Sequence, residues 1–406
     1  MEERQYELDI DVRILELLGP NLYTNIYYVL AELIANAYDA DAHNVYIISS
    51  DDRIIVEDDG KGMSYSKGEV TKYLKVAAIS RNNEEDSKTA LDRLKMGRKG
   101  VGKLAALSVS EEVQVMTVSD GEKSGFILSR HPQSKNLHSI PNDNISFKRI
   151  QGNGTSIVML SPQYQLHKTP TAIKRNLLKI FPAISEDFKI HIIMGNKEDV
   201  IDSVDKEIGR ELCACILLGD KSSNIKNTFR SEYSNVELLI ENQPKVFSLM
   251  LKDNQGIEKL YDLVIKGWIG AYKTTRGRKL ESSDFPDNFI SLYAHDKMGE
   301  FNILPVVGAN RLNESYVVGQ LYVDLFELSE LPDMALSNRQ GYKSDDPRYI
   351  KVIEYVKDEL LPNIIAKRVA YAKAKKDQSE KEKVNKQEEE ERTFRLNVKE
   401  FRKSTS

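Results

Sequence analysis

The chain has little cysteine, a single tryptophan and no long hydrophobic run. The two cysteines among its 406 residues, Cys213 and Cys215, lie too close for an ordinary disulfide and lack partners for a zinc site. No apolar run approaches the roughly 18–20 residues of a membrane span, and the acidic start, MEERQYELDIDVRI, has no signal-peptide core. We therefore expect two buried thiols and a reducing, cytoplasmic location without membrane partners.

A strong charge of either sign is also missing. The formal net charge of −4 gives the chain no global attraction to nucleic acid, although a local basic patch remains an option. The stretch YKTTRGRKLESS places Lys273, Arg276, Arg278 and Lys279 beside Tyr272. It predicts either a phosphate-backbone contact or an ordinary solvated loop. The composition, 40% hydrophobic and 30% charged, is typical of a globular protein.

Hydrophobic spacing predicts helices and strands in alternation over the first half of the chain. Apolar residues recur every three or four positions from Tyr23 to Tyr38, which predicts a helix. Residues 45–48 and 54–56 predict two short strands joined by a polar turn. Residues 64–102 are polar and charged up to a glycine cluster, which predicts a mobile lid. Three later regions predict further elements. Residues 103–119 predict a short helix and a strand, residues 152–160 contain a predicted strand, and residues 172–194 contain a predicted helix and strand.

The second half predicts a strand-rich α+β unit followed by a polar helix. Strands are expected in NVELLIE, KVFSLMLK, YDLVIKGWIGAY, FISLYAHD, FNILPVVG and YVVGQLYVDLFE. Residues 347–377 have helical spacing, and the following charge-mixed run without Gly or Pro predicts a solvated helix or coil. We expect an α/β domain over residues 1–204, an α+β domain over 205–362, and a charged helical or disordered tail over 363–406.

The glycine cluster GRKGVGKLAAL suggests phosphate binding. Gly97, Gly102 and Lys103 fit the G-x-x-x-x-G-K start of a P-loop, but Leu104 stands where that motif needs Ser or Thr. A P-loop must also follow a buried strand, whereas the preceding KTALDRLKM is polar and helical. The glycines can still present backbone N–H groups to a phosphate, and magnesium must then be held from elsewhere.

The predicted first helix supplies candidate groups for that magnesium. Glu32 and Asn36 are four residues apart, so they share one helix face, and Asp39 follows three residues later. An Asn oxygen can ligate Mg²⁺ together with phosphate oxygens, and a carboxylate one turn earlier is placed to orient a water. The alternative is that these residues merely decorate an amphipathic helix.

A second candidate cluster follows the second predicted strand in EDDGKGMS. Asp58 could accept the exocyclic amine of adenine, while Gly60 and Gly62 let the backbone approach the base and Met63 offers an apolar wall. Thr155, at the start of a later strand, could complete a polar contact to the base. Each element alone is weak, because D-x-G-x-G is also a common turn.

Taken together, these segments resemble a known superfamily. ELIANAYDA, DDGKGM, GRKGVGK and GTSIVML occur in the order and spacing of the GHKL ATPases, which include gyrase B subunits, ninety-kilodalton heat-shock chaperones, histidine kinases, MutL and the MORC proteins. The resemblance covers roughly residues 20–200. It implies the left-handed Bergerat ATP-binding fold, an α/β two-layer sandwich, with Leu104 in the core.

The resemblance also implies roles for individual residues. Glu32 is expected to be the general base, Asn36 the Mg²⁺ ligand and Asp58 the adenine reader. The remaining ATP-binding candidates are Asp39, Gly60, Gly62, Met63, Gly97, Lys99, Gly100, Val101, Gly102, Lys103 and Thr155.

The branch within the superfamily is indicated by what lies around these motifs. Histidine kinases need a phospho-accepting His before the nucleotide motifs, and no His precedes Glu32. The segment MALSNRQGYKSDD resembles the N-[KR]-Q element of MORC ATPases, by which a second domain reaches the γ-phosphate. It implies a catalytic role for Arg339 with Gln340 and Asn338, with Lys343 as a weaker candidate; the alternative is an ordinary helix N-terminus.

The function expected from this resemblance is ATP hydrolysis with Mg²⁺, most like prokaryotic MORC-like or heat-shock-chaperone-like ATPases. Lid closure and homodimerisation on ATP binding would make the protein a clamp or switch that acts on DNA or a protein partner. The second domain would then be transducer-like. The competing hypothesis is a nucleotide sensor or scaffold that does not hydrolyse ATP and recruits an effector protein.

Overall fold

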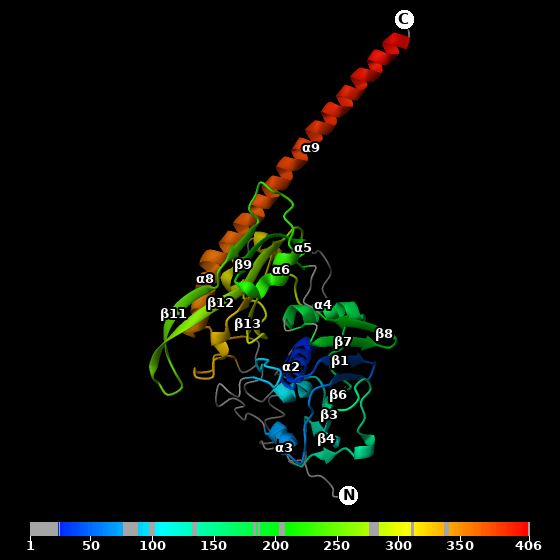
Figure 1. Ribbon diagram of the computed structural model, residues 1–406, viewed down its shortest axis with the longest axis vertical. Helices are drawn as coiled ribbons and strands as arrows, with labels where there is room; N and C mark the ends of the chain where they lie inside the picture. The colour runs from blue at the N-terminus through cyan, green and yellow to red at the C-terminus, as the bar shows by residue number, and fades with distance from the viewer. Residues whose placement is uncertain are drawn as a thin grey trace.

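The structure is a computed structural model built around two β-sheets and a long C-terminal helix (Figure 1). It describes residues 23, 25–75, 88–96, 102–131, 136–181, 184–185, 187–202, 208–275, 284–309, 312–336 and 341–404. We call residues 23–202, around the first sheet, the N-terminal unit, and residues 208–404, around the second sheet, the C-terminal unit. Within these ranges no helix combines the length and apolar character needed to cross a bilayer.

The first sheet has eight strands in the order β5-β4-β3-β6-β2-β1-β7-β8. All neighbours are antiparallel except β1 and β7, which are parallel. The strands are β1 (Asn44–Ser49), β2 (Arg53–Asp58), β3 (Glu112–Ser119), β4 (Glu122–Ser129), β5 (His138–Ser139), β6 (Gly154–Leu160), β7 (Lys189–Met194) and β8 (Lys197–Ile201). Alternate residues of β3 are buried, as expected for a sheet with one covered face.

Helix α2 (Ile26–Asp39) is the central helix of the N-terminal unit. The Asn25 side chain caps it by accepting the Tyr27 N–H at 3.0 Å, which satisfies one of the free donors of the first turn. Nine of its 14 residues are buried, so tertiary packing rather than local propensity stabilises it. The described residues of this unit also form the helical segments α3 (Glu69–Leu74), η2 (Gly102–Ser108), η3 (Asn142–Asn144) and α4 (Pro170–Ile180).

These elements confirm most of the expectations for the first half. The first helix, the strand pair around residues 50–52, the strand after the glycines and the later helix and strand all form where the spacing predicted. The predicted lid differs in two respects. Its residues Glu69–Leu74 form helix α3. KTALDRLKM, which was expected to be helical, instead forms a turn closed by an antiparallel bridge between Lys88 and Leu94.

The second sheet has the order β10-β9-β12-β15-β13-β14, and β11 pairs with β12 outside this path. Its strands are β9 (Leu212–Leu218), β10 (Leu239–Asn242), β11 (Lys245–Lys252), β12 (Glu258–Tyr272), β13 (Phe289–Ala294), β14 (Lys297–Glu300) and β15 (Val317–Tyr322). Every residue of β9, β13 and β15 is buried. Short helical segments complete the unit: α5 (Ile208–Glu211), η4 (Asp220–Ser222), α6 (Ser223–Thr228), α7 (Leu304–Val307), η5 (Leu312–Tyr316) and η6 (Asp324–Glu327).

The predicted strand at FNILPVVG is wrong, because α7 forms there instead. Pro305 lacks an N–H for a strand ladder but suits the first turn of a helix. The Asn302 side chain supports that turn by accepting the Leu304 N–H at 3.0 Å. The expected buried thiols are confirmed: Cys213 and Cys215 are free and buried in β9, and burial raises the pKa of Cys213 to about 11.

The far part of the long C-terminal helix extends away from the body of the protein (Figure 1). Helix α8 (Pro347–Tyr355), capped by the Asp346 side chain, continues through a π-helical stretch, η7 (Val356–Leu360), into α9 (Leu361–Ser404). Up to residue 398, where the description of side-chain burial in α9 ends, Ala374 is the last buried residue, and residues 375–397 are all exposed. The charged tail is therefore a solvated helix over the residues described.

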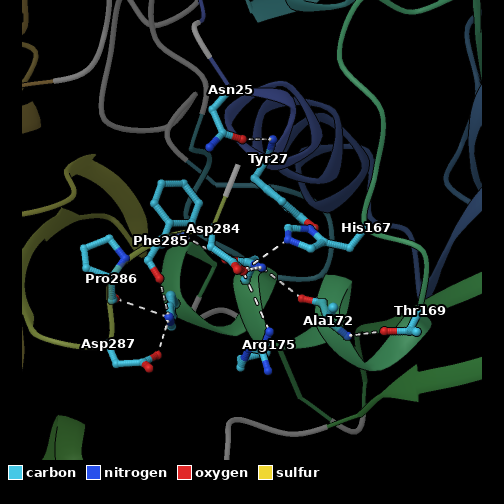
Figure 2. Close-up of polar contacts among 12 residues, drawn as sticks. Asn25, Tyr27, His167, Thr169, Ala172, Arg175, Asp284, Phe285, Pro286 and Asp287 are labelled. Carbon is cyan, nitrogen blue, oxygen red and sulfur yellow. Dashed lines mark hydrogen bonds and ion pairs between the residues drawn. The ribbon is translucent and has the colours of Figure 1, made fainter. Parts of the chain in front are cut away.

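A polar seam joins the two units at α2 and α4 (Figure 2). Tyr27 and His167 share a hydrogen bond through the Tyr27 hydroxyl and Nδ1, and His167 Nε2 lies 3.2 Å from Asp284 Oδ1. Asn176 Nδ2 also donates to Asp284 Oδ1, at 2.8 Å. Lys179 donates to the carbonyl of the residue after Asp284, at 2.7 Å. Because these groups are buried and paired, the seam fixes the C-terminal unit against the helix that carries Glu32.

Candidate functional site

Glu32 is a buried carboxylate on α2 that contacts the C-terminal unit. Glu32 is only 6% exposed to solvent. Lys297, the first residue of β14, places Nζ 2.9 Å from Oε1 and 3.0 Å from Oε2 of Glu32. Asn36 lies one turn further along α2 and is exposed. A charged, paired carboxylate and an accessible carboxamide thus occupy the helix face that the spacing predicted.

Asp58 ends β2 in a row of polar side chains that crosses three strands. Asp58 pairs with Thr155 on β6, which pairs with Thr117 on β3, so the three side chains share one sheet face. The two threonine hydroxyls are 3.3 Å apart. Burial raises the pKa of Asp58 to about 7, although a hydrogen bond from the Gly60 N–H opposes this shift. The row combines an acid that titrates near neutrality with two hydroxyls.

Asp58 differs from its two acidic neighbours. Glu57 points to the other face, where it accepts the N–H groups of Lys148 and Arg149 at 2.9 Å. Asp59 accepts the N–H groups of His43 and Asn44 at 2.7 Å. Both neighbours therefore have structural partners, and Asp58 is the member of this run that faces Thr155.

The predicted glycines around Asp58 allow close backbone contacts. Gly62 has φ +67°, and a Cβ there would lie 2.0 Å from the Val118 carbonyl oxygen. The same strand edge is fixed by the Met63 N–H, which donates to Thr117 Oγ1 at 2.9 Å. Gly60 is equally confined, since a Cβ would lie 2.8 Å from the Ala40 carbonyl oxygen. Both glycines are required by packing.

The phosphate-binding glycine segment lies partly outside the described residues. Gly97, Lys99, Gly100 and Val101 are not described, whereas Gly102 and Lys103 begin the 3₁₀ helix η2. The expectation that Leu104 belongs to the core is confirmed, because it is 3% exposed.

Asp39 holds the chain that leads into this glycine segment. Asp39 Oδ1 accepts the Met96 N–H at 2.8 Å, and Asp41 accepts the Ala90 N–H at 3.0 Å. Arg93 adds a hydrogen bond to the Ala42 carbonyl at 2.6 Å. Residues 88–96 are therefore attached to the C-terminal end of α2, and Asp39 acts there as an anchor.

The second-unit candidates are only partly visible. Arg339, Gln340 and Asn338 lie outside the described residues, as do Arg276 to Lys279 of the basic stretch. Lys343 is exposed and donates from Nζ to the Asp333 carbonyl at 2.9 Å, which is a turn contact. Lys273 pairs with Glu232 at 2.6 Å.

Lys297 is the site residue that sequence reasoning missed. It follows the predicted strand FISLYAHD, and no motif connects it with a helix some 265 positions earlier. The available signal was the tight hairpin, whose two-residue loop between Ala294 and Lys297 places Lys297 on the return strand. That signal predicts a hairpin but not its contact with α2.

Comparison with known proteins agrees with this geometry. Residues 23–155 match the family described as histidine kinase-, DNA gyrase B-, and HSP90-like ATPase. The N-terminal unit thus contains a GHKL-like ATPase domain, which confirms the resemblance and implies ATP binding.

A named relative extends the similarity beyond that domain. Over 396 residues the chain is 28% identical to a protein of Herpetosiphon aurantiacus named "Putative type II restriction enzyme HgiDII". The alignment covers 95% of this chain and 60% of the relative, so the chain spans about three fifths of that protein's length.

Proposed function

We propose that the chain is an ATPase that hydrolyses ATP to ADP and phosphate with Mg²⁺, using a Bergerat-type two-layer sandwich in its N-terminal unit. The observation that carries this proposal is Glu32, an ionisable side chain kept nearly out of solvent on α2 and paired with a lysine. A buried charge is costly unless it is paired, and such groups gather at functional sites. The matched ATPase family supplies the substrate.

In this mechanism Glu32 would orient the attacking water, and Asn36 would hold Mg²⁺ through its carboxamide oxygen. The exposed position of Asn36 suits an ion that keeps several waters and phosphate oxygens as ligands. When bound, Mg²⁺ neutralises charge that develops on the phosphate oxygens. Asp58 accepts the adenine amine, with Thr155 beside it and Met63 as an apolar wall.

Closure of the site is assigned to two segments. Gly97, Lys99, Gly100, Val101, Gly102 and Lys103 would wrap the phosphates, with Asp39 anchoring the chain just before them. Arg339, assisted by Gln340, would bring the transducer-like C-terminal unit to the γ-phosphate. We propose that closure promotes homodimerisation and that the protein works as a clamp or switch in the cytoplasm; the domain boundaries at 204 and 362 stay predictions.

DNA is the partner that the relative's name favours, since that protein is named a restriction enzyme. The competing proposal is a sensor or scaffold that binds ATP without hydrolysing it and recruits an effector protein. Stimulation of hydrolysis by duplex DNA, weakened steeply by salt, would support the DNA clamp. A protein partner predicts no such stimulation.

The deciding experiment is phosphate release by the purified chain with ATP and Mg²⁺. We expect slow turnover, since closure limits many such cycles, and its loss on chelation of Mg²⁺. Glu32→Gln should retain ATP binding and lose hydrolysis, whereas Asn36→Ala should lose Mg²⁺-dependent binding. Glu388→Gln, an exposed change on α9, is the matched control. Hydrolysis by Glu32→Gln at the control rate would reject the base assignment.

The oligomeric state tests the clamp separately. Sedimentation with ADP and with a non-hydrolysable ATP analogue should give a lighter and a heavier species. Nucleotide binding without hydrolysis in the wild type would favour the sensor instead.

A further inference from the structure

The hairpin formed by β13 and β14 contacts α2 through the ion pair between Lys297 and Glu32. Lys297 reaches Glu32, and Glu300, at the other end of β14, is close enough to Tyr28 for its charge to help raise the Tyr28 pKa to about 12, after the larger effect of burial. Tyr28 and Glu32 are one turn apart on α2. The start of β14 is therefore tied, through Lys297, to the helix face that carries the proposed base.

The turn of this hairpin is held in place by the C-terminal unit. His295 and Asp296 form a two-residue turn with φ +48° and +60°, a conformation that non-glycine residues adopt at some cost. The His295 N–H donates to Asp324 Oδ1 at 2.9 Å, and Asp296 pairs with Lys221. The residue next to this anchored turn is Lys297, so its backbone position is fixed by the second sheet.

The other side of β14 is closed by Tyr342. A Cβ on Gly299 would lie 1.7 Å from the Tyr342 hydroxyl oxygen, so the ring packs directly on the strand backbone. Tyr342 is buried and packs edge-on against Phe326 at 4.7 Å between ring centroids. β14 is thus packed on the core of the C-terminal unit, and its first residue pairs with Glu32 on α2.

The Lys297 ammonium spans both carboxylate oxygens of Glu32 from a side chain that is 22% exposed. An ion pair with this little solvent is screened less than a surface pair, and its geometry restricts the carboxylate rotamer. We propose that Lys297 is a positioning residue for ATP hydrolysis: it holds the Glu32 carboxylate in a fixed orientation only while the C-terminal unit is docked on α2. This inference rests on the proposed function and adds the residue that couples the two units.

The test compares Lys297→Met, Lys297→Arg and Lys252→Met. Lys252 is the matched control, since it lies in the same unit on a solvent-exposed pair with Glu258. We expect Lys297→Met to lower kcat by about 10- to 100-fold, as expected for a small misplacement of a reacting group, with ATP affinity within about threefold of the control. Lys297→Arg should recover part of kcat because it restores the charge.

A kcat for Lys297→Met equal to or above the control would overturn the proposal, because the pair would then be neutral or inhibitory. A loss of ATP affinity as large as the loss of kcat would also overturn it, since a positioning role predicts a lower kcat with nearly unchanged affinity. Circular dichroism melts of each variant identify any that fail to fold, and Lys297→Arg keeps the test open in that case.

A second readout needs no hydrolysis. Thermal melts of Glu32→Gln, Lys297→Met and the double variant form a cycle, and their Tm shifts should be non-additive by at least about 2 °C if the residues are paired. Additive shifts would overturn the pairing itself. A wild type that hydrolyses no ATP but shows coupling would reject the proposed function and leave the contact intact.

Discussion

Helix α2 and the exposed part of α9 are both helices, but different forces hold them. α2 buries nine of 14 residues, and its polar groups contact other elements. Residues 375–397 of α9 are exposed and have pairs such as Lys376–Glu380 within the helix itself. The first helix depends on residues far away in sequence, and the second on neighbours one turn away. A substitution should therefore act strongly in the first and weakly in the second.

The largest expected effect is a cavity in the buried helix. Leu30 is fully buried on α2, so Leu30→Ala should lower the free energy of unfolding by about 2–5 kcal/mol. Val384→Ala, at a half-exposed position on α9, should change it by less than about 0.5 kcal/mol. Urea unfolding measures both variants. Equal losses of unfolding free energy would contradict the difference expected between α2 and α9.

The next effect concerns the close backbone contact beside Asp58. Gly62→Ala would place a methyl group 2.0 Å from a carbonyl oxygen, whereas Gly68, also at positive φ, has open space around it. Gly62→Ala should therefore cost about 1–3 kcal/mol more than Gly68→Ala, and it should weaken ATP binding. If the two variants unfold at the same urea concentration, steric confinement at Gly62 is not the cause.

The pH dependence of stability gives a moderate effect in the same region. The folded-state pKa of Asp58 is raised from 3.8 to about 7, so between these values the folded chain retains a proton that the unfolded chain releases. The stabilisation that this retained proton gives the folded state is therefore fully present below about pH 4 and is lost as the pH rises through 7.

Asp58→Asn should remove that dependence. Relative to this variant, the wild type should lose on the order of 1–2 kcal/mol between pH 4.5 and 7.5, a figure reduced for the partial exposure of Asp58. Denaturation at several pH values measures the difference. Parallel curves for the two proteins would contradict the raised pKa.

The smallest effect is expected in the tail. Lys376→Ala removes an exposed pair with Glu380, one turn away on α9, and should cost about 0.2–0.5 kcal/mol at low salt. Helix content by circular dichroism with and without salt measures it. A loss of several times this size would show that α9 has a partner along this stretch.

Much of the N-terminal unit could be predicted because its signals are local. The spacing in YTNIYYVLAELIANAY indicated α2, two apolar runs joined by a polar turn indicated β1 and β2, and Leu104 was expected in the core. The strand predicted at FNILPVVG failed because the prediction gave more weight to the apolar pattern than to Pro305, which cannot donate to a strand ladder. The pairing of Lys297 with Glu32 could not be predicted, since it depends on where a hairpin docks.

The sequence alone determined which residue types stand at helical and strand spacing, and so the two candidate clusters around Glu32 and Asp58. Tertiary structure decided their partners: Lys297 for Glu32, Thr155 beside Asp58, and Met96 for Asp39. The reason is physical. Helical and strand periodicity act over a few residues, whereas burial and ion pairing depend on distances that only the packed chain fixes.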